Sequence, residues 1–166
     1  MLIREARLED AEGLITVMKN AEESNFMLFG PGERQLESKQ FAVFIEKMRY
    51  QFNSTIFIAE VKDNIVGYLI VQGDTPSRIA HRAYIVIGIH SDFRGRGIGT
   101  ALFSKLNDWA KNKSIHRLEL TVMVDNTVGI ALYKKMGFEI EGTKRHSLRV
   151  NGSYVDEYYM AKFLPI

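Results

Sequence analysis

The segment that most constrains the fold is an apolar run that leads directly into a glycine-rich turn and then into a helical pattern. Residues 82–90 (RAYIVIGIH) are mostly apolar, which is typical of a central strand buried on both faces. The turn that follows (SDFRGRGIG) has glycine at every second position from 95 to 99. From residue 98 onward apolar side chains recur every three to four positions, which predicts an amphipathic helix. A buried strand, a tight turn and a helix in direct succession indicate an α/β fold.

The remaining segments supply further strands and helices around this unit. Asn151-Gly152 is typical of a type I′ hairpin turn, and it separates the last two strand-like segments. The resulting order, β, α, α, β, β, β, α, β, α, β, β, predicts one α/β domain over residues 1–166 with a mixed sheet. Helical spacing covers residues 10–23, 35–52 and 126–136, and strand patterns cover residues 2–7, 55–73 (two strands joined at 62–64) and 116–124.

Composition excludes several classes of function. The chain of 166 residues has a net charge of +2, which is too small to indicate binding to nucleic acid or to a membrane surface. It contains no cysteine, so disulfides, thiolate metal sites and a cysteine nucleophile are excluded, and we expect no metal cofactor. The first residues (MLIREARLEDAEGL) lack the apolar core of a signal peptide, and no apolar run is long enough to span a bilayer. These features predict a cytoplasmic protein.

The glycine turn has the chemistry of an anion site. Gly97 and Gly99 lack the Cβ atoms that would keep a ligand away from the backbone. The first N–H groups of the following helix have no intrahelical partner, and the helix dipole favours negative charge there. Arg94 and Arg96 can add charge-assisted hydrogen bonds to phosphate oxygens.

Known glycine motifs fit this turn unequally. A Walker-type loop is excluded because no Lys-Ser or Lys-Thr pair follows the last glycine. The dinucleotide motif GxGxxG also fails, because Thr100 takes the place of a required glycine and Glu119 opens the next strand rather than closing it. Two interpretations stay open, a strand-to-helix turn that simply needs glycine and a pyrophosphate site for another cofactor.

A second motif lies downstream, in residues 126–138 (NTVGIALYKKMGF). Asn126 and Tyr133 are seven residues apart, which places both on one side of a helix. Either could be structural, Asn126 as a helix cap and Tyr133 as a packing residue. Gly137 fits the left-handed position after a helix. The core side of this helix is predicted to consist of Val128, Ala131, Leu132 and Met136.

Together the two motifs resemble those of the GNAT superfamily of acetyl-CoA-dependent N-acetyltransferases. The first family motif is Arg or Gln, two residues, Gly, one residue, and Gly or Ala; the second is Asn, then Leu-Tyr two turns later, then Gly-Phe. The resemblance covers nearly the whole chain and is nearest to the ribosomal-protein alanine, polyamine and phosphinothricin-type enzymes, although Gly129 stands where alanine is usual. The matching residues are Arg94, Gly97, Gly99, Asn126, Leu132, Tyr133, Gly137 and Phe138.

The resemblance implies a GNAT-like, mostly antiparallel sheet with helices on both faces. It implies direct transfer of acetyl from acetyl-CoA to a primary amine in a ternary complex, the acceptor being a protein N-terminus or a small amine. Free backbone groups near Gly88 and Ile89 would bind the pantetheine and polarise the thioester, Asn126 would bind the pantetheine or hold the loop, and Tyr133 would be the general acid. The pyrophosphate would bind Arg94, Gly95, Arg96, Gly97, Ile98, Gly99 and Thr100.

The general base and the acceptor site are less defined. Where some relatives carry a glutamate, this chain has Thr121, which cannot take a proton at neutral pH. Glu119 on the same strand is the candidate base, and the alternatives are that it is structural or that water relays the proton. In the superfamily the acceptor walls come from segments equivalent to residues 22–34 and 144–158. Acidic and aromatic residues in the first of these could attract a cationic amine.

A non-catalytic acetyl-CoA sensor or interaction module on the same fold is the alternative to an enzyme, because Thr121 replaces a base. Dimers are common in the superfamily, so a homodimer is one expectation, although no interface can be read from the sequence.

Overall fold

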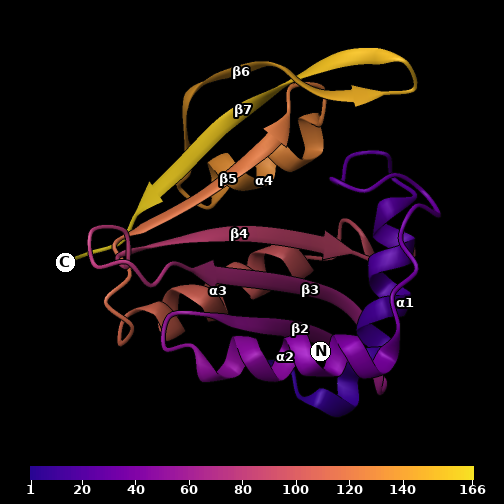
Figure 1. Cartoon of the computed structure of the whole chain (residues 1–166), viewed down its shortest axis with the longest axis vertical. Helices are drawn as coiled ribbons and strands as arrows, with labels where there is room; N and C mark the ends of the chain where they lie inside the picture. The colour runs from indigo at the N-terminus through magenta and orange to yellow at the C-terminus, as the bar shows by residue number, and fades with distance from the viewer.

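Seven strands form one sheet in this computed structural model, which describes residues 1–166 (Figure 1). The spatial order is β1-β2-β3-β4-β5-β7-β6, and every neighbouring pair is antiparallel except the parallel pair β4 and β5. The predicted mixed, mostly antiparallel sheet is therefore confirmed. The strands are β1 (Leu2–Glu5), β2 (Thr55–Val61), β3 (Asn64–Gly73), β4 (Arg82–Ile89), β5 (Arg117–Met123), β6 (Glu139–Val150) and β7 (Ser153–Phe163).

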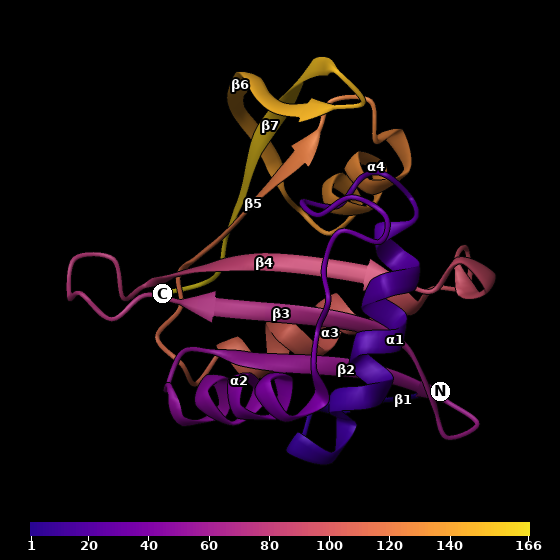
Figure 2. The same cartoon turned by 45° about the vertical axis from the view of Figure 1, so that its right-hand side comes forward.

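Helices cover both faces of this sheet, as predicted. One hydrophobic core lies between the sheet and α1 and α2, and the other lies between the sheet and α3 and α4 (Figures 1 and 2). No helix has both the length and the apolar composition that crossing a bilayer requires. The helices are α1 (Ala11–Glu22), α2 (Ser38–Tyr50), α3 (Ile98–Ala110) and α4 (Thr127–Lys135), with short 3-10 turns η1 (Leu8–Asp10) and η2 (Ser91–Phe93).

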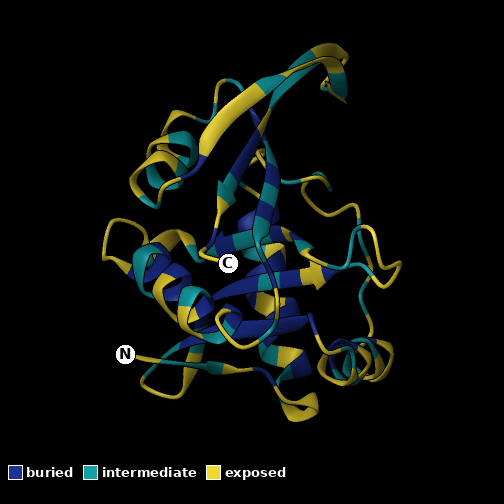
Figure 3. Ribbon diagram, turned by 90° about the vertical axis from the view of Figure 1, so that its left-hand side faces the viewer, coloured by how far each residue is buried: buried dark blue, intermediate teal, exposed yellow.

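Alternation along the central strands assigns side chains to the two cores. On β3, Leu69 and Val71 pack toward α3, whereas Tyr68 packs toward α1 and α2. The central strands are accordingly buried over most of their length, while β6 is exposed or half-buried (Figure 3). The predicted turn between β6 and β7 is also confirmed, since Asn151 and Gly152 both have positive φ, of 50° and 82°.

The orientation of α4 differs from the prediction at two of the four expected core residues, while Leu132 and Met136 pack against the core as predicted. Val128 is 80% exposed and Ala131 is also exposed, whereas Ile130, Leu132 and Tyr133 pack toward the core on the α3 side. A nine-residue helix with apolar residues on most of its sides does not determine its own rotation. Packing against α3 determines it instead.

An ion pair at the start of the chain makes the free energy of unfolding depend on pH. The Arg4 guanidinium donates to both carboxylate oxygens of Asp10 at 2.8 and 2.9 Å, and the Arg7 N–H donates to one of them at 2.8 Å. The hydrogen bond from Arg4 is the largest cause that lowers the pKa of Asp10 below its usual 3.8. The charged form is thus favoured in the folded state, so this contribution is present above pH 3.8 and is lost as the pH falls through the lower folded pKa.

We expect Asp10→Asn to lower the free energy of unfolding at pH 7 by about 1–3 kcal/mol, because charged hydrogen bonds are lost. Urea unfolding measures this effect, and the difference from wild type should shrink as the pH is taken below 3.8. Asp108→Asn, at an exposed carboxylate that pairs only with Lys111, is the control and should change stability little. A difference that persists undiminished in acid would contradict the assignment.

Candidate active site

The turn between β4 and α3 presents a row of unpaired backbone N–H groups. Gly95 and Gly97 have φ values of +73° and +80°, in the left-handed region that favours glycine, and Gly97 directly precedes α3. None of the N–H groups of residues 94–99 donates to another protein group, and α3 has no side-chain cap. A Cβ at Gly95 or Gly97 would meet no atom within 4 Å, so the space beside both is open. This is the geometry of an anion site at a helix N-terminus.

Three cationic side chains surround this turn. Arg94 and Arg96 are exposed and neither pairs with a carboxylate. The third is Lys135 in the last turn of α4, whose Nζ lies 3.4 Å from Oγ1 of Thr100. Sequence reasoning did not single out Lys135, because lysine is ordinary in the last turn of a helix. Only the approach of α4 to α3 places it beside the turn.

Ile98 and Gly99 differ from the other residues of the turn. The side chain of Ile98 lies in the core, so only its backbone faces the turn. A Cβ at Gly99 would lie 2.8 Å from Cδ2 of Leu132. Glycine at this position therefore lets α3 pack closely against α4, whereas Gly95 and Gly97 keep the anion site open.

Strands β4 and β5 pair only over their first residues and then separate. Their parallel pairing covers only residues 82–84 of β4 and 117–119 of β5. The His90 N–H donates to Val66 on the β3 side, and the His81 carbonyl accepts from Arg117 on the β5 side. Because backbone direction alternates along a strand, the odd-numbered residues of β4 face β5. The backbone of Ile89 therefore faces the gap between the strands, whereas that of Gly88 faces β3.

Gly88 contributes to the site through its missing side chain. A Cβ at this position would lie 2.5 Å from the hydroxyl of Tyr68, whose ring is almost fully buried. The Tyr68 phenol therefore lies directly against β4, on the face covered by α1. Sequence reasoning did not identify Tyr68, because its position in an apolar strand is that of an ordinary core residue.

We expect Gly88→Ala to destabilise the protein by about 1–3 kcal/mol, because the buried Tyr68 ring must shift to admit one methyl group. Thermal or urea unfolding measures the change. Gly142→Ala is the matched control, since a Cβ there meets nothing within 4 Å and its φ is not positive. Equal stability of both variants would contradict the close contact between Gly88 and Tyr68.

The second motif combines a helix cap with a half-buried tyrosine. Oδ1 of Asn126 accepts from the Gly129 N–H at 3.0 Å, so Asn126 is the N-cap of α4. Tyr133 packs edge-on against Phe103 and Phe138, with ring centroids 6.1 Å away from each. Burial raises the pKa of Tyr133 to about 12, and the neighbouring Tyr84 adds a smaller effect. Its hydroxyl is thus protonated at neutral pH.

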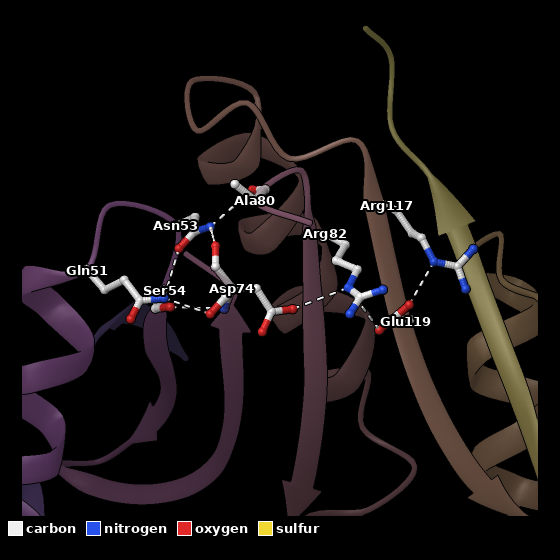
Figure 4. A network of polar contacts seen from close by, with 9 residues as sticks. Gln51, Asn53, Ser54, Asp74, Ala80, Arg82, Arg117 and Glu119 are labelled. Carbon is white, nitrogen blue, oxygen red and sulfur yellow. Dashed lines mark hydrogen bonds and ion pairs between the residues drawn. The ribbon is translucent and has the colours of Figure 1, made fainter. Parts of the chain in front are cut away.

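Glu119 lies at the paired end of β4 and β5, between two arginines (Figure 4). Nε of Arg117 donates to it at 2.7 Å, and Nε of Arg82 lies 3.9 Å from its other oxygen. Two residues further along β5, Oγ1 of Thr121 shares a 2.7 Å hydrogen bond with the hydroxyl of Tyr84. Glu119 therefore pairs with Arg117 on its own strand and more weakly with Arg82 on β4.

Four of these side chains border a cavity of about 260 Å³. The lining residues are Tyr84, Arg117, Glu119, Leu120, Thr121, Tyr159 and Met160.

The two predicted acceptor segments lie toward the other end of β4, near Ile89 (Figure 1). The last turn of α1 is joined to the end of β4, because the side chain of Asn20 accepts from the Ser91 N–H at 2.8 Å and donates to its Oγ at 3.1 Å. Residues 22–34 continue from there, and residues 144–158 belong to the β6–β7 hairpin, whose tip extends toward the segment after α1 (Figures 1 and 2). The structure contains no group of three or more His, Asp or Glu side chains placed to hold a metal ion.

An open anion turn, a separated strand pair and a protonated tyrosine beside them define the class of fold and site found in acetyltransferases. A family model described as acetyltransferase (GNAT) family matches residues 18–138. The chain belongs to this family.

Individual relatives agree with this assignment. The L-amino acid N-acetyltransferase AaaT of Escherichia coli K12 is 42% identical over 107 residues, which are 63% of this chain and 65% of that protein, slightly less than two thirds of its length. A GNAT-family acetyltransferase from Streptococcus pneumoniae superposes with a TM-score of 0.93 at 27% identity over 99% of each chain. A ribosomal-protein-alanine N-acetyltransferase from Brucella melitensis superposes with a TM-score of 0.86 at 27% identity, over 99% of this chain and 100% of that one.

Proposed function

We propose that this protein is an N-acetyltransferase that moves an acetyl group from acetyl-CoA to a primary amine by direct attack in a ternary complex. The observation that carries the proposal is the row of unpaired N–H groups at residues 94–99, directly beside the gap between β4 and β5. Phosphate oxygens fit the turn, and an extended arm fits an unpaired strand edge. Membership of the acetyltransferase family supports the same cofactor.

Different residues around the turn would bind different parts of acetyl-CoA. The backbone N–H groups from Gly95 to Thr100 would bind the pyrophosphate, and Arg94, Arg96 and Lys135 would add charge. The free backbone of Ile89 would hydrogen-bond the pantetheine arm and the thioester carbonyl. Asn126 already uses Oδ1 as a cap, which leaves its Nδ2 as the donor for the same arm.

Tyr133 is the proposed general acid. Acetyl-CoA supplies a thioester, and as the amine nitrogen bonds to its carbonyl carbon the carbon–sulfur bond breaks and the sulfur leaves as a thiolate. A pKa of about 12 keeps the Tyr133 hydroxyl protonated, so it can donate a hydrogen bond or a proton to that sulfur. The amine must lose its proton as well. Glu119 is the candidate base, but its hydrogen bond from Arg117 favours a structural role, with water accepting the proton.

The acceptor is a small amine or a protein N-terminus in this proposal. The E. coli relative, named as an L-amino acid N-acetyltransferase, favours a free amino acid, and the Brucella structure, named as a ribosomal-protein-alanine enzyme, represents the N-terminal alternative. A cytoplasmic location and a homodimer stay predictions.

Calorimetric titration with acetyl-CoA, followed by a panel of amines monitored by thiol release, tests the proposal. Binding together with release on one class of amine is the expected result. Binding without release on any amine would favour a non-catalytic acetyl-CoA sensor. Absence of binding would contradict the proposal and leave the glycines with a role in the turn alone.

A further inference from the structure

An ion pair at the end of α1, between the buried Glu22 and the half-buried Arg34, is not used by the proposed transfer step. Glu22 is the only charged residue that is buried, at 2% exposure, and it is the last residue of α1. Nε and Nη2 of Arg34 both donate to Oε2 of Glu22, at 3.2 and 2.8 Å. Removing the Glu22 carboxylate from water is costly, so this pair is weak evidence for stability. Its presence at the edge of the site suggests a role in binding.

The Arg34 guanidinium is fixed in orientation, and its Nη1 side makes no hydrogen bond to the protein. The guanidinium stacks on the ring of Phe29, 4.2 Å from the centroid, and two of its five N–H groups are used by Glu22. The other three, including both on Nη1, have no protein partner, and the side chain is 24% exposed. A fixed guanidinium with a free edge is suited to bidentate recognition of a carboxylate.

The pair lies beside the reactive end of the site. The bonds between Asn20 and Ser91 hold the last turn of α1 against the end of β4. The phenol of Tyr68 lies against Gly88 on β4. Burial raises the pKa of Tyr68, and the charges of Glu22 and Arg34 modify it further, as expected if this hydroxyl lies between the ion pair and β4.

A cavity lined equally by apolar and polar residues adjoins Arg34. Its volume is about 280 Å³, and the rings of Phe41 and Phe44 lie 5.6 Å apart on its wall. A cavity of this size accommodates an aliphatic or aromatic side chain. The full lining is Arg34, Leu36, Glu37, Gln40, Phe41 and Phe44.

Resting on the proposed function, we infer that Arg34 is the residue that selects the acceptor. It binds the α-carboxylate of a free α-amino acid with an apolar side chain, and Glu22 is the positioning residue that holds its guanidinium. A protein N-terminus has an amide in place of that carboxylate, so it lacks this contact. The acceptor is thus a free amino acid rather than a polypeptide.

The test compares L-leucine and L-phenylalanine with their carboxamides, which keep the amine and side chain but lack the carboxylate. Wild type should acetylate the acids with the higher kcat/KM. Arg34→Gln should lower kcat/KM for the acids about 10- to 100-fold, mainly through KM, and change that for the amides less than about threefold. Arg34→Lys keeps the charge but not the pair of parallel N–H donors, so its kcat/KM for the acids should lie between those of wild type and Arg34→Gln. Glu22→Gln should also raise KM for the acids selectively.

Arg49→Gln, at an exposed arginine of α2, is the matched control and should leave kcat/KM for all four substrates unchanged. Acetyl-CoA calorimetry on every variant reports whether the fold and the cofactor site persist. Equal losses on acids and amides in Arg34→Gln and Arg34→Lys overturn the inference, and so does a wild type that acetylates neither acid while binding acetyl-CoA. A wild type that does not bind acetyl-CoA overturns the proposed function itself.

Discussion

We expect Tyr133→Phe to lower kcat about 10²–10⁴-fold, the range for loss of a general acid, while the Kd for acetyl-CoA should change less than about threefold. The substitution removes one hydroxyl and keeps the ring that packs against Phe103 and Phe138. Binding contacts at the glycine turn are not touched, so the loss falls on turnover. Thiol release gives kcat, and calorimetry gives Kd.

The pH dependence adds a second check on Tyr133. A pKa of about 12 predicts no fall in kcat from ionisation of this tyrosine at pH values up to about 10. Tyr50→Phe, at an exposed tyrosine of α2, is the control and should retain full turnover. If Tyr133→Phe keeps wild-type turnover, Tyr133 is a packing residue and another group protonates the thiolate.

We expect Gly97→Val to weaken acetyl-CoA binding at least about tenfold, equivalent to about 1.4 kcal/mol. The new side chain would occupy the open space beside the unpaired N–H groups, and a β-branched residue at φ +80° also strains the turn by roughly 1–2 kcal/mol. Both effects displace the N–H groups from the phosphate oxygens. Calorimetry measures Kd, and urea unfolding measures the strain separately.

Gly152→Val is the control that distinguishes backbone strain from steric exclusion of the phosphates. Gly152 has a similar φ of +82° and equally open surroundings, but it lies in the β6–β7 turn. It should lose comparable stability and keep its affinity for acetyl-CoA. Unchanged affinity in Gly97→Val would place the phosphates elsewhere.

The two motifs could be found in the sequence, but the role of each residue in them could not. The three glycines of the turn look equivalent in sequence, yet Gly95 and Gly97 adopt positive φ over open space whereas Gly99 lies under Leu132. The difference arises from α4, which is more than twenty residues away along the chain. Similarly, Val128 fits a helical stripe in sequence but is exposed, because packing rather than periodicity sets the rotation of α4.

Local features were legible in the sequence because they depend on neighbouring residues. The order of strands and helices follows from periodicity, the turns at Gly137 and at Asn151-Gly152 follow from backbone preference, and the cap at Asn126 follows from one side chain.

Only the tertiary structure decided which distant residues meet. The parting of β4 and β5, the approach of Lys135 to Thr100 and the pairing of Glu22 with Arg34 each join separate segments. Such contacts depend on the order of strands in the sheet and on how helices pack across it. Periodicity does not encode these distances, so the anion turn with Arg94 and Arg96 could be predicted from the sequence, whereas the approach of Lys135 from another helix could not.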